Sequence, residues 1–87
     1  MSNGSVYRLA GANNWNCDTL PGYEEVRDLD QCKSFTQMTG KLFAGTERSS
    51  SDPIGCYANG YDWNAFYFNY VSFGGGGDWQ FPLCFKS

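Results

Sequence analysis

Two Asp-Trp pairs are the residues of this chain whose types suggest a definite chemistry. One pair, at residues 62–63, follows an Asn-Gly turn signal, and the other, at 78–79, follows a run of four glycines. An indole ring stacks on the apolar C–H faces of a sugar, while carboxylate and amide groups hydrogen-bond sugar hydroxyls. Glycine-bearing turns place both pairs on loops, where a scaffold usually presents its recognition residues. The predicted ligand-binding residues are Tyr57, Asn59, Tyr61, Asp62, Trp63, Asn64, Asp78 and Trp79.

The high aromatic content of the chain supports the same prediction. Phe, Tyr and Trp make up 18% of 87 residues, more than a core of this size needs, and exposed Tyr and Trp are enriched at recognition surfaces. One alternative is that each Trp closes an edge of the core beside a turn acid. Another is a structural or interaction subunit, whose aromatic face docks on a larger protein assembly as one contiguous apolar patch.

The other acidic residues form no catalytic or metal-binding pattern. Glu24 and Glu25 are adjacent and would point apart on a strand, while Asp28 and Asp30 stand at a predicted helix start, where the helix dipole favours negative charge. The chain has no histidine, its acids lack the alternating spacing of a calcium loop, and the glycines at 74–77 do not match a phosphate-binding GxGxxG motif. We therefore expect a protein that is not an enzyme and holds no metal or other cofactor.

Composition narrows the expected partners. The net charge is −3 and the six Lys and Arg residues are scattered singly, whereas non-specific nucleic-acid binding needs a basic stripe. No apolar run approaches the ~20 residues that cross a membrane. We expect a binding module whose partner is a glycan or an extracellular or lumenal protein, with no nucleic-acid binding and no membrane span.

Four cysteines indicate the redox environment and a pairing. They are widely spread, without a C-x-x-C pair, and an even number in a small domain is typical of disulfides in secreted or lumenal proteins; four buried thiols in a cytosolic protein are the alternative. Cys32 on the apolar face of the predicted helix and Cys56 in a central strand both point to the helix–sheet interface. Cys17 follows the first strand and Cys84 lies in the last, and terminal strands often lie side by side. We predict the pairs Cys32–Cys56 and Cys17–Cys84.

A single helix is predicted at residues 29–39. Asp28 offers an N-cap, because its carboxylate can accept hydrogen bonds from the unpaired amides of the first turn, and Gly40 offers a stop. Apolar side chains recur every three residues, close enough to the helical period to share one broad face. These side chains are Leu29, Cys32, Phe35 and Met38.

Short strands complete an expected α+β fold, in which one helix packs on a small, mainly antiparallel sheet with two disulfides. Residues 1–5 are expected to be flexible and residues 6–87 to form one domain. The polar stretch 45–53 is expected to be a mobile loop without core residues, and 74–77 a flexible tract. Alternation in one strand places Phe66, Phe68 and Tyr70 toward the helix and Tyr67, Asn69 and Val71 away from it. The strands are expected at residues 6–10, 41–44, 54–57, 65–72 and 80–86.

Several short motifs resemble a known domain family. The runs VYRLAGANNWNC, DLDQCKSF, PIGCY, FYFN and PLCFK resemble a small cysteine domain repeated in secreted algal and other protist proteins. In that domain a helix cysteine is followed by a Gly-Cys-Tyr strand, an aromatic-Phe-Asn strand and a closing Cys-x-Lys. The nested disulfides also resemble the PAN/apple class, which is extracellular and binds proteins or glycans, although cysteine number and spacing differ. The resemblance implies a secreted, disulfide-bonded fold and, by analogy of fold with PAN/apple domains, binding.

Overall fold

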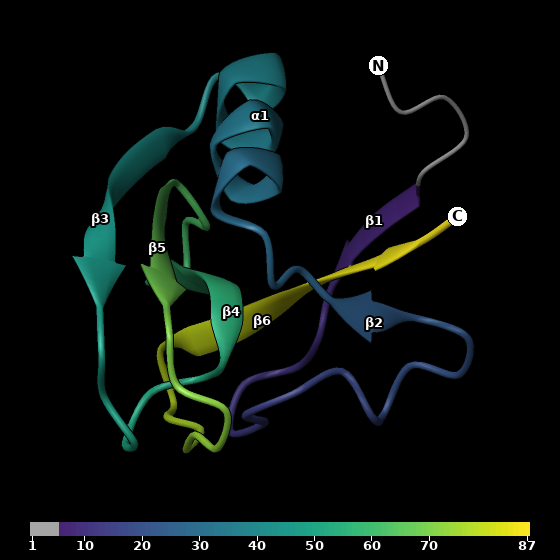
Figure 1. The fold of residues 1–87 in the computed structure, drawn as a ribbon, viewed down its shortest axis with the longest axis vertical. Helices are drawn as coiled ribbons and strands as arrows, with labels where there is room; N and C mark the ends of the chain where they lie inside the picture. Colours follow the sequence, from purple (N-terminus) through teal and green to yellow (C-terminus); the bar gives the residue numbers. More distant parts are fainter. Residues whose placement is uncertain (1–5) are drawn as a thin grey trace.

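The protein is an α+β domain, as the sequence predicts. A computed structural model describes residues 6–87, so the flexible segment expected at 1–5 lies outside the described residues. One helix packs on a mixed sheet of six strands (Figure 1). In chain order the elements are β1 (Val6–Leu9), β2 (Glu24–Glu25), α1 (Leu29–Thr39), β3 (Leu42–Glu47), β4 (Gly55–Asn59), β5 (Ala65–Asn69) and β6 (Gln80–Lys86).

The sheet brings the two ends of the domain together. Its strand order is β1-β6-β4-β5-β3, and the short β2 also pairs with β6. β1 runs antiparallel to β6, with Val6 opposite Lys86. The remaining pairs are antiparallel too, except that β3 is parallel to β5. Because β4 is paired on its other side with β6, β3 takes the free edge of β5, which runs in the same direction.

Local chemistry fixes both ends of α1. Asp28 is the N-cap, and its carboxylate accepts a hydrogen bond from the backbone N–H of Asp30 (3.1 Å). Gly40 ends the helix in a left-handed conformation with φ of 71°, and the N–H of Lys41 then donates to the Thr36 carbonyl (2.9 Å). The predicted helix, cap and stop are therefore confirmed.

The predicted apolar face of α1 is only partly right. Cys32 is completely buried, and Leu29 and Phe35 pack against the core, but Met38 is 70% exposed. A spacing of three residues falls short of the 3.6-residue turn, so successive apolar positions drift around the helix until Met38 faces solvent. Thr36, one turn after Cys32, is buried in its place.

The core between α1 and the sheet contains the first predicted disulfide. Cys32 of α1 is bonded to Cys56 of β4, and both side chains are fully buried. The bond therefore fastens the helix to a strand in the middle of the sheet. The buried side chains around it are Val26, Ala58, Phe66, Phe68, Phe81 and Leu83.

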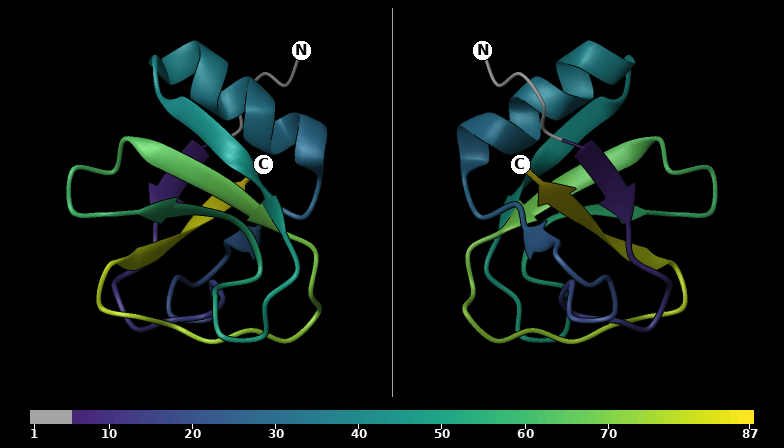
Figure 2. Two further views of the ribbon diagram at one scale, coloured as in Figure 1. Left: turned by 90° about the vertical axis from the view of Figure 1, so that its left-hand side faces the viewer. Right: turned by 90° about the vertical axis from the view of Figure 1, so that its right-hand side faces the viewer.

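The second predicted disulfide lies on the opposite face of the sheet. Cys84 of β6 is bonded to Cys17 in the loop after β1, with a sequence separation of 67. With Ala10 these cysteines form a second buried cluster, against which Leu20 and Tyr23 pack. No helix covers this face among the described residues; loops cover it instead (Figure 2).

Asn69 of β5 holds the loop at residues 45–53, predicted to lack core residues, against the sheet by hydrogen bonds. β3 extends to Glu47, and Pro53 is buried, so the prediction for 45–53 is wrong. The buried Asn69 amide donates to the carbonyls of Ser49 (2.8 Å) and Pro53 (2.9 Å) and accepts from the Ser49 N–H (2.9 Å). β5 ends at Asn69, earlier than expected, and Tyr70 is consequently exposed rather than packed on the helix.

Close packing of loops explains the glycine run at 74–77. A methyl group added at Gly76 would lie 2.6 Å from the Asn13 carbonyl oxygen and 2.7 Å from the Asn14 nitrogen, which is closer than such atoms approach. A backbone hydrogen bond from Asn13 to Gly77 (3.0 Å) holds the two loops together. The run therefore permits close approach of backbones instead of forming the expected flexible tract.

Replacing Gly76 with Ala should lower the free energy of unfolding by about 1–3 kcal/mol, because an overpacked site forces the backbone to shift. Gly11→Ala is the matched control, since the nearest group to its new methyl is the Asn14 side chain at 3.6 Å. Denaturant unfolding with both disulfides intact measures the two variants. A Gly76→Ala protein as stable as the wild type would mean that the run is flexible and not packed.

Candidate functional site

The two Asp-Trp segments meet at one end of the sheet. β4 and β5 form a hairpin whose last pair is Asn59 and Ala65, and its loop projects from the side of the molecule (Figure 2). On the other side of β4, Asn59 pairs with Gln80 at the start of β6. This register places Trp79 beside the hairpin loop, where its carbonyl accepts a hydrogen bond from the Gly60 N–H (2.6 Å).

Three exposed aromatic rings lie there, two of them packed on a buried fourth ring. Tyr61 packs against Trp79 with ring centroids 4.9 Å apart, and Tyr61 and Trp63 lie 6.0 and 5.7 Å from Phe81. Phe81 is buried, whereas Tyr61, Trp63 and Trp79 are 62%, 46% and 59% exposed. Rings this exposed do not close the edge of a core. We call Tyr61, Trp63 and Trp79 the aromatic cluster.

Polar groups accompany the aromatic cluster. The Asp62 carboxylate accepts a hydrogen bond from the backbone N–H of Asn64 (3.3 Å), which is a local turn that shapes the loop. Trp63 has a left-handed backbone with φ of 53°, uncommon for a residue other than glycine. Seven of the eight predicted binding residues therefore lie exposed on two neighbouring segments: Asn59, Tyr61, Asp62, Trp63, Asn64, Asp78 and Trp79.

Tyr57, the eighth predicted binding residue, lies elsewhere. Alternation along β4 turns it away from Cys56 and the helix, onto the face that loops cover, where it is 3% exposed. Its ring stacks on Tyr67 with centroids 5.8 Å apart, and its hydroxyl donates a hydrogen bond to the Glu47 carboxylate. The fold therefore separates Tyr57 from the aromatic cluster.

A carboxyl pair that no sequence motif revealed lies on this face. Glu47 accepts from Tyr57, and Asp52 accepts from the side-chain amide of Gln80. Burial raises the pKa of Glu47, the hydrogen bond from Tyr57 opposes that change, and the nearby Asp52 carboxyl raises the pKa further. Burial, and then the Glu47 carboxylate, raise the pKa of the Tyr57 phenol. Glu47 therefore holds its proton to a higher pH than an isolated glutamate does.

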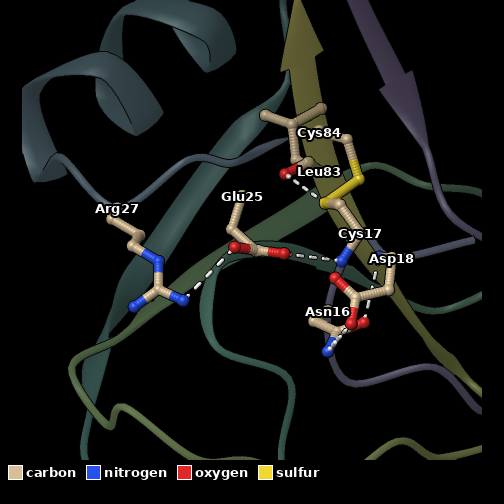
Figure 3. A network of polar contacts seen from close by, with 7 residues as sticks. All are labelled: Asn16, Cys17, Asp18, Glu25, Arg27, Leu83 and Cys84. Carbon is tan, nitrogen blue, oxygen red and sulfur yellow. Dashed lines mark hydrogen bonds and ion pairs between the residues drawn. A yellow bond between two sulfur atoms is a disulfide. The ribbon is translucent and has the colours of Figure 1, made fainter. Parts of the chain in front are cut away.

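Among the acids expected to be structural, Asp28 caps α1 and Glu25 also has partners. Figure 3 shows Glu25 of β2 between two donors, the backbone N–H of Cys17 (2.8 Å) and the Arg27 guanidinium (3.2 Å). The Cys17 sulfur also lies 3.7 Å from the Leu83 carbonyl oxygen. Because a disulfide sulfur has no hydrogen to donate, this is a packing contact. Glu25 thus helps to hold the Cys17 loop against the sheet.

A hollow of about 200 Å³ lies away from the aromatic cluster, where none of the predicted binding residues lines it. Two of its polar side chains have partners, because Asn69 bonds the 45–53 loop and Arg27 bonds Glu25. The lining residues are Arg27, Gly55, Phe68, Asn69, Tyr70, Val71 and Ser72.

Residues 6–87 contain neither a metal-binding cluster of side chains nor a helix that could span a membrane. No three His, Cys, Asp or Glu side chains are grouped there in a way that could hold a metal ion. α1, the helix of this part of the chain, is neither long nor apolar enough to cross a lipid bilayer.

Comparisons with known proteins leave the family open. No protein-family model, curated protein or solved structure matches the chain. The resemblance to the algal-type cysteine domain and to PAN/apple domains therefore stays a prediction.

Glu47→Gln should remove a pH dependence from the stability of the protein. Because folding raises the pKa of Glu47 above 4.5, its contribution to stability is complete below that pH and is lost as the pH rises through the raised value. The amide keeps an acceptor for Tyr57 and cannot ionise. We expect the wild type to lose stability relative to the variant as the pH rises from 4.5 toward neutrality.

Thermal unfolding of both proteins across this pH range measures the difference. Glu24→Gln is the control, since it removes the same charge from an exposed position of β2. If the Glu47→Gln and wild-type melting temperatures ran parallel over the whole range, Glu47 would titrate as an ordinary carboxyl.

Proposed function

We propose that this protein is a non-catalytic binding module that recognises a glycan through the aromatic cluster. The observation that carries the proposal is the gathering of Tyr61, Trp63 and Trp79 from two separate segments, each with roughly half of its side chain exposed. A buried ring, Phe81, packs against Tyr61 and Trp63, and Trp79 packs against Tyr61.

Exposed rings beside acids and amides suit the surface of a sugar. The rings can cover the apolar C–H faces, from which water is displaced on binding. Asp62, Asn64 and Asp78 lie beside the rings in the chain and can hydrogen-bond hydroxyl groups. The Asp62 carboxylate uses one oxygen for its turn, so the other is free to accept from a ligand.

The scaffold favours a preformed surface. The hairpin loop is joined to Trp79 by the Gly60 hydrogen bond, and Tyr61 and Trp63 both contact Phe81 of β6. Side chains that are already held in place lose less conformational entropy on binding.

Docking on a larger protein assembly is the alternative proposal. A docking face is expected to be one contiguous apolar patch, whereas acids and amides interrupt the aromatic cluster. Met38 of α1 and Phe73 of the loop after β5 are exposed on other elements, whereas Leu42 of β3 borders the hairpin loop, where its N–H donates to the Asn64 carbonyl (2.8 Å). The acids and amides among the rings therefore favour the glycan.

The two disulfides are consistent with an oxidising, non-cytosolic compartment. We accordingly propose that the module acts outside the cell or in an organelle lumen, where glycans are abundant.

Trp79→Ala and Tyr61→Ala should each weaken glycan binding at least about tenfold, because central aromatic side chains usually dominate recognition. Both rings are exposed, so each substitution should destabilise the fold by less than the ~3–5 kcal/mol of a buried Trp truncation. A glycan array with the purified, oxidised protein identifies the ligand, and calorimetry and thermal unfolding then measure the variants.

Phe73→Ala is the matched control. Phe73 is 72% exposed and packs on Trp15 (4.8 Å), outside the aromatic cluster, so its loss should leave affinity unchanged. Folded Trp79→Ala and Tyr61→Ala proteins that bind as tightly as the wild type would exclude the cluster as the binding surface.

A further inference from the structure

The charge beside the aromatic cluster is negative. This charge bears on which glycans the cluster can bind, an inference that rests on the proposed function. Asp62 and Asp78 stand in the two segments that carry the rings, and no Lys or Arg occurs between residues 49 and 85. Within residues 6–87 the one ion pair joins Arg27 to Glu25, so neither aspartate of the site is neutralised by a salt bridge.

Five of the six cations of the chain contact partners elsewhere. Lys41 is the one that the sheet brings toward the site, because the N–H of the next residue, Leu42, donates to the Asn64 carbonyl (2.8 Å). A single cation at the border does not balance two acids. The other contacts are Arg8 and Lys86 on Tyr23, Lys33 on Phe43, Arg48 on Tyr70 and Arg27 with Glu25.

Two neighbouring rings of the site, Tyr61 and Trp79, are tilted against each other. The interplanar angle between Tyr61 and Trp79 is 61°, and Tyr61 and Trp63 make angles of 64° and 72° with Phe81. Coplanar rings can lie together on the flat face of a crystalline polysaccharide, but Tyr61 and Trp79 cannot both lie flat on one plane. They can contact a single sugar chain, whose units present C–H faces in different directions.

We propose that the ligand is an uncharged glycan, bound as a single soluble chain. The carboxylates of Asp62 and Asp78 accept hydrogen bonds from hydroxyl groups, and they repel sulfate or carboxylate groups that come within about a Debye length, ~8 Å at physiological ionic strength. Glycans bearing sulfate, uronic acid or sialic acid are therefore disfavoured, and so are crystalline polysaccharide surfaces.

Three probes test the proposal: a neutral soluble oligosaccharide selected on the array, its sulfated derivative, and an insoluble crystalline polysaccharide of the same sugar. In calorimetry at ~0.15 M salt, the sulfated derivative should bind at least about tenfold more weakly than the neutral one. The crystalline material should not retain the protein in a sedimentation assay.

Charge variants separate the effect of the acids from that of the rings. Asp62→Asn and Asp78→Asn should each raise the affinity for the sulfated derivative relative to the neutral probe. Asp30→Asn is the matched control, because it removes the same charge at the start of α1, on the opposite side of the molecule from the hairpin loop (Figure 2). It should leave the ratio of the two affinities unchanged.

The outcomes distinguish this inference from the proposed function. Equal or tighter binding of the sulfated derivative would overturn the uncharged class, and retention on the crystalline polysaccharide would overturn the single-chain mode. In either case the proposed function would stand if Trp79→Ala abolished the binding of the sulfated derivative or of the crystalline polysaccharide, because the aromatic cluster would still be the binding surface. Absence of binding to every glycan, or binding of a Lys-rich peptide in its place, would overturn the proposed function and this inference together.

Discussion

The bond between Cys32 and Cys56 is the constraint on which the rest of the fold depends. β4 lies between β6 and β5, so this bond fastens α1 to the strand that joins the two halves of the sheet. A chain of 87 residues buries comparatively little apolar surface. A crosslink of this span can add up to roughly 3.5 kcal/mol to the free energy of unfolding, which is a large fraction of the total for a small domain. The helix can therefore serve as one complete layer of the core.

The opposite face of the sheet has loops as its second layer, and this arrangement determines where the site can lie. The Cys17–Cys84 bond, the Asn69 hydrogen bonds and the close approach at Gly76 hold those loops in place. The β4–β5 hairpin extends past both layers, so its aromatic rings stay exposed although they stand on a buried Phe81. A rigid interior and an exposed aromatic surface thus coexist in a very short chain.

Features set by neighbouring residues could be predicted from the sequence, and features set by distant contacts could not. The cap at Asp28 and the stop at Gly40 act within one turn of α1, and the pairing of the cysteines could be inferred from the element in which each one lies. Burial of Tyr57 depends instead on Glu47, on another strand. The parallel edge strand, the role of Asn69 and the support from Phe81 likewise arise only when separate segments meet, so no local pattern indicated them.

A ¹H–¹⁵N NMR titration of the oxidised protein with a neutral oligosaccharide tests the central claim, that the aromatic cluster is the binding surface, most directly. The three tryptophans each report through an indole N–H. We predict shifts at the indole signals of Trp63 and Trp79 and at the amides of residues 59–64, while Trp15 stays unchanged. Shifts confined to Trp15 or to the hollow beside Arg27, with none at the aromatic cluster, would contradict the claim.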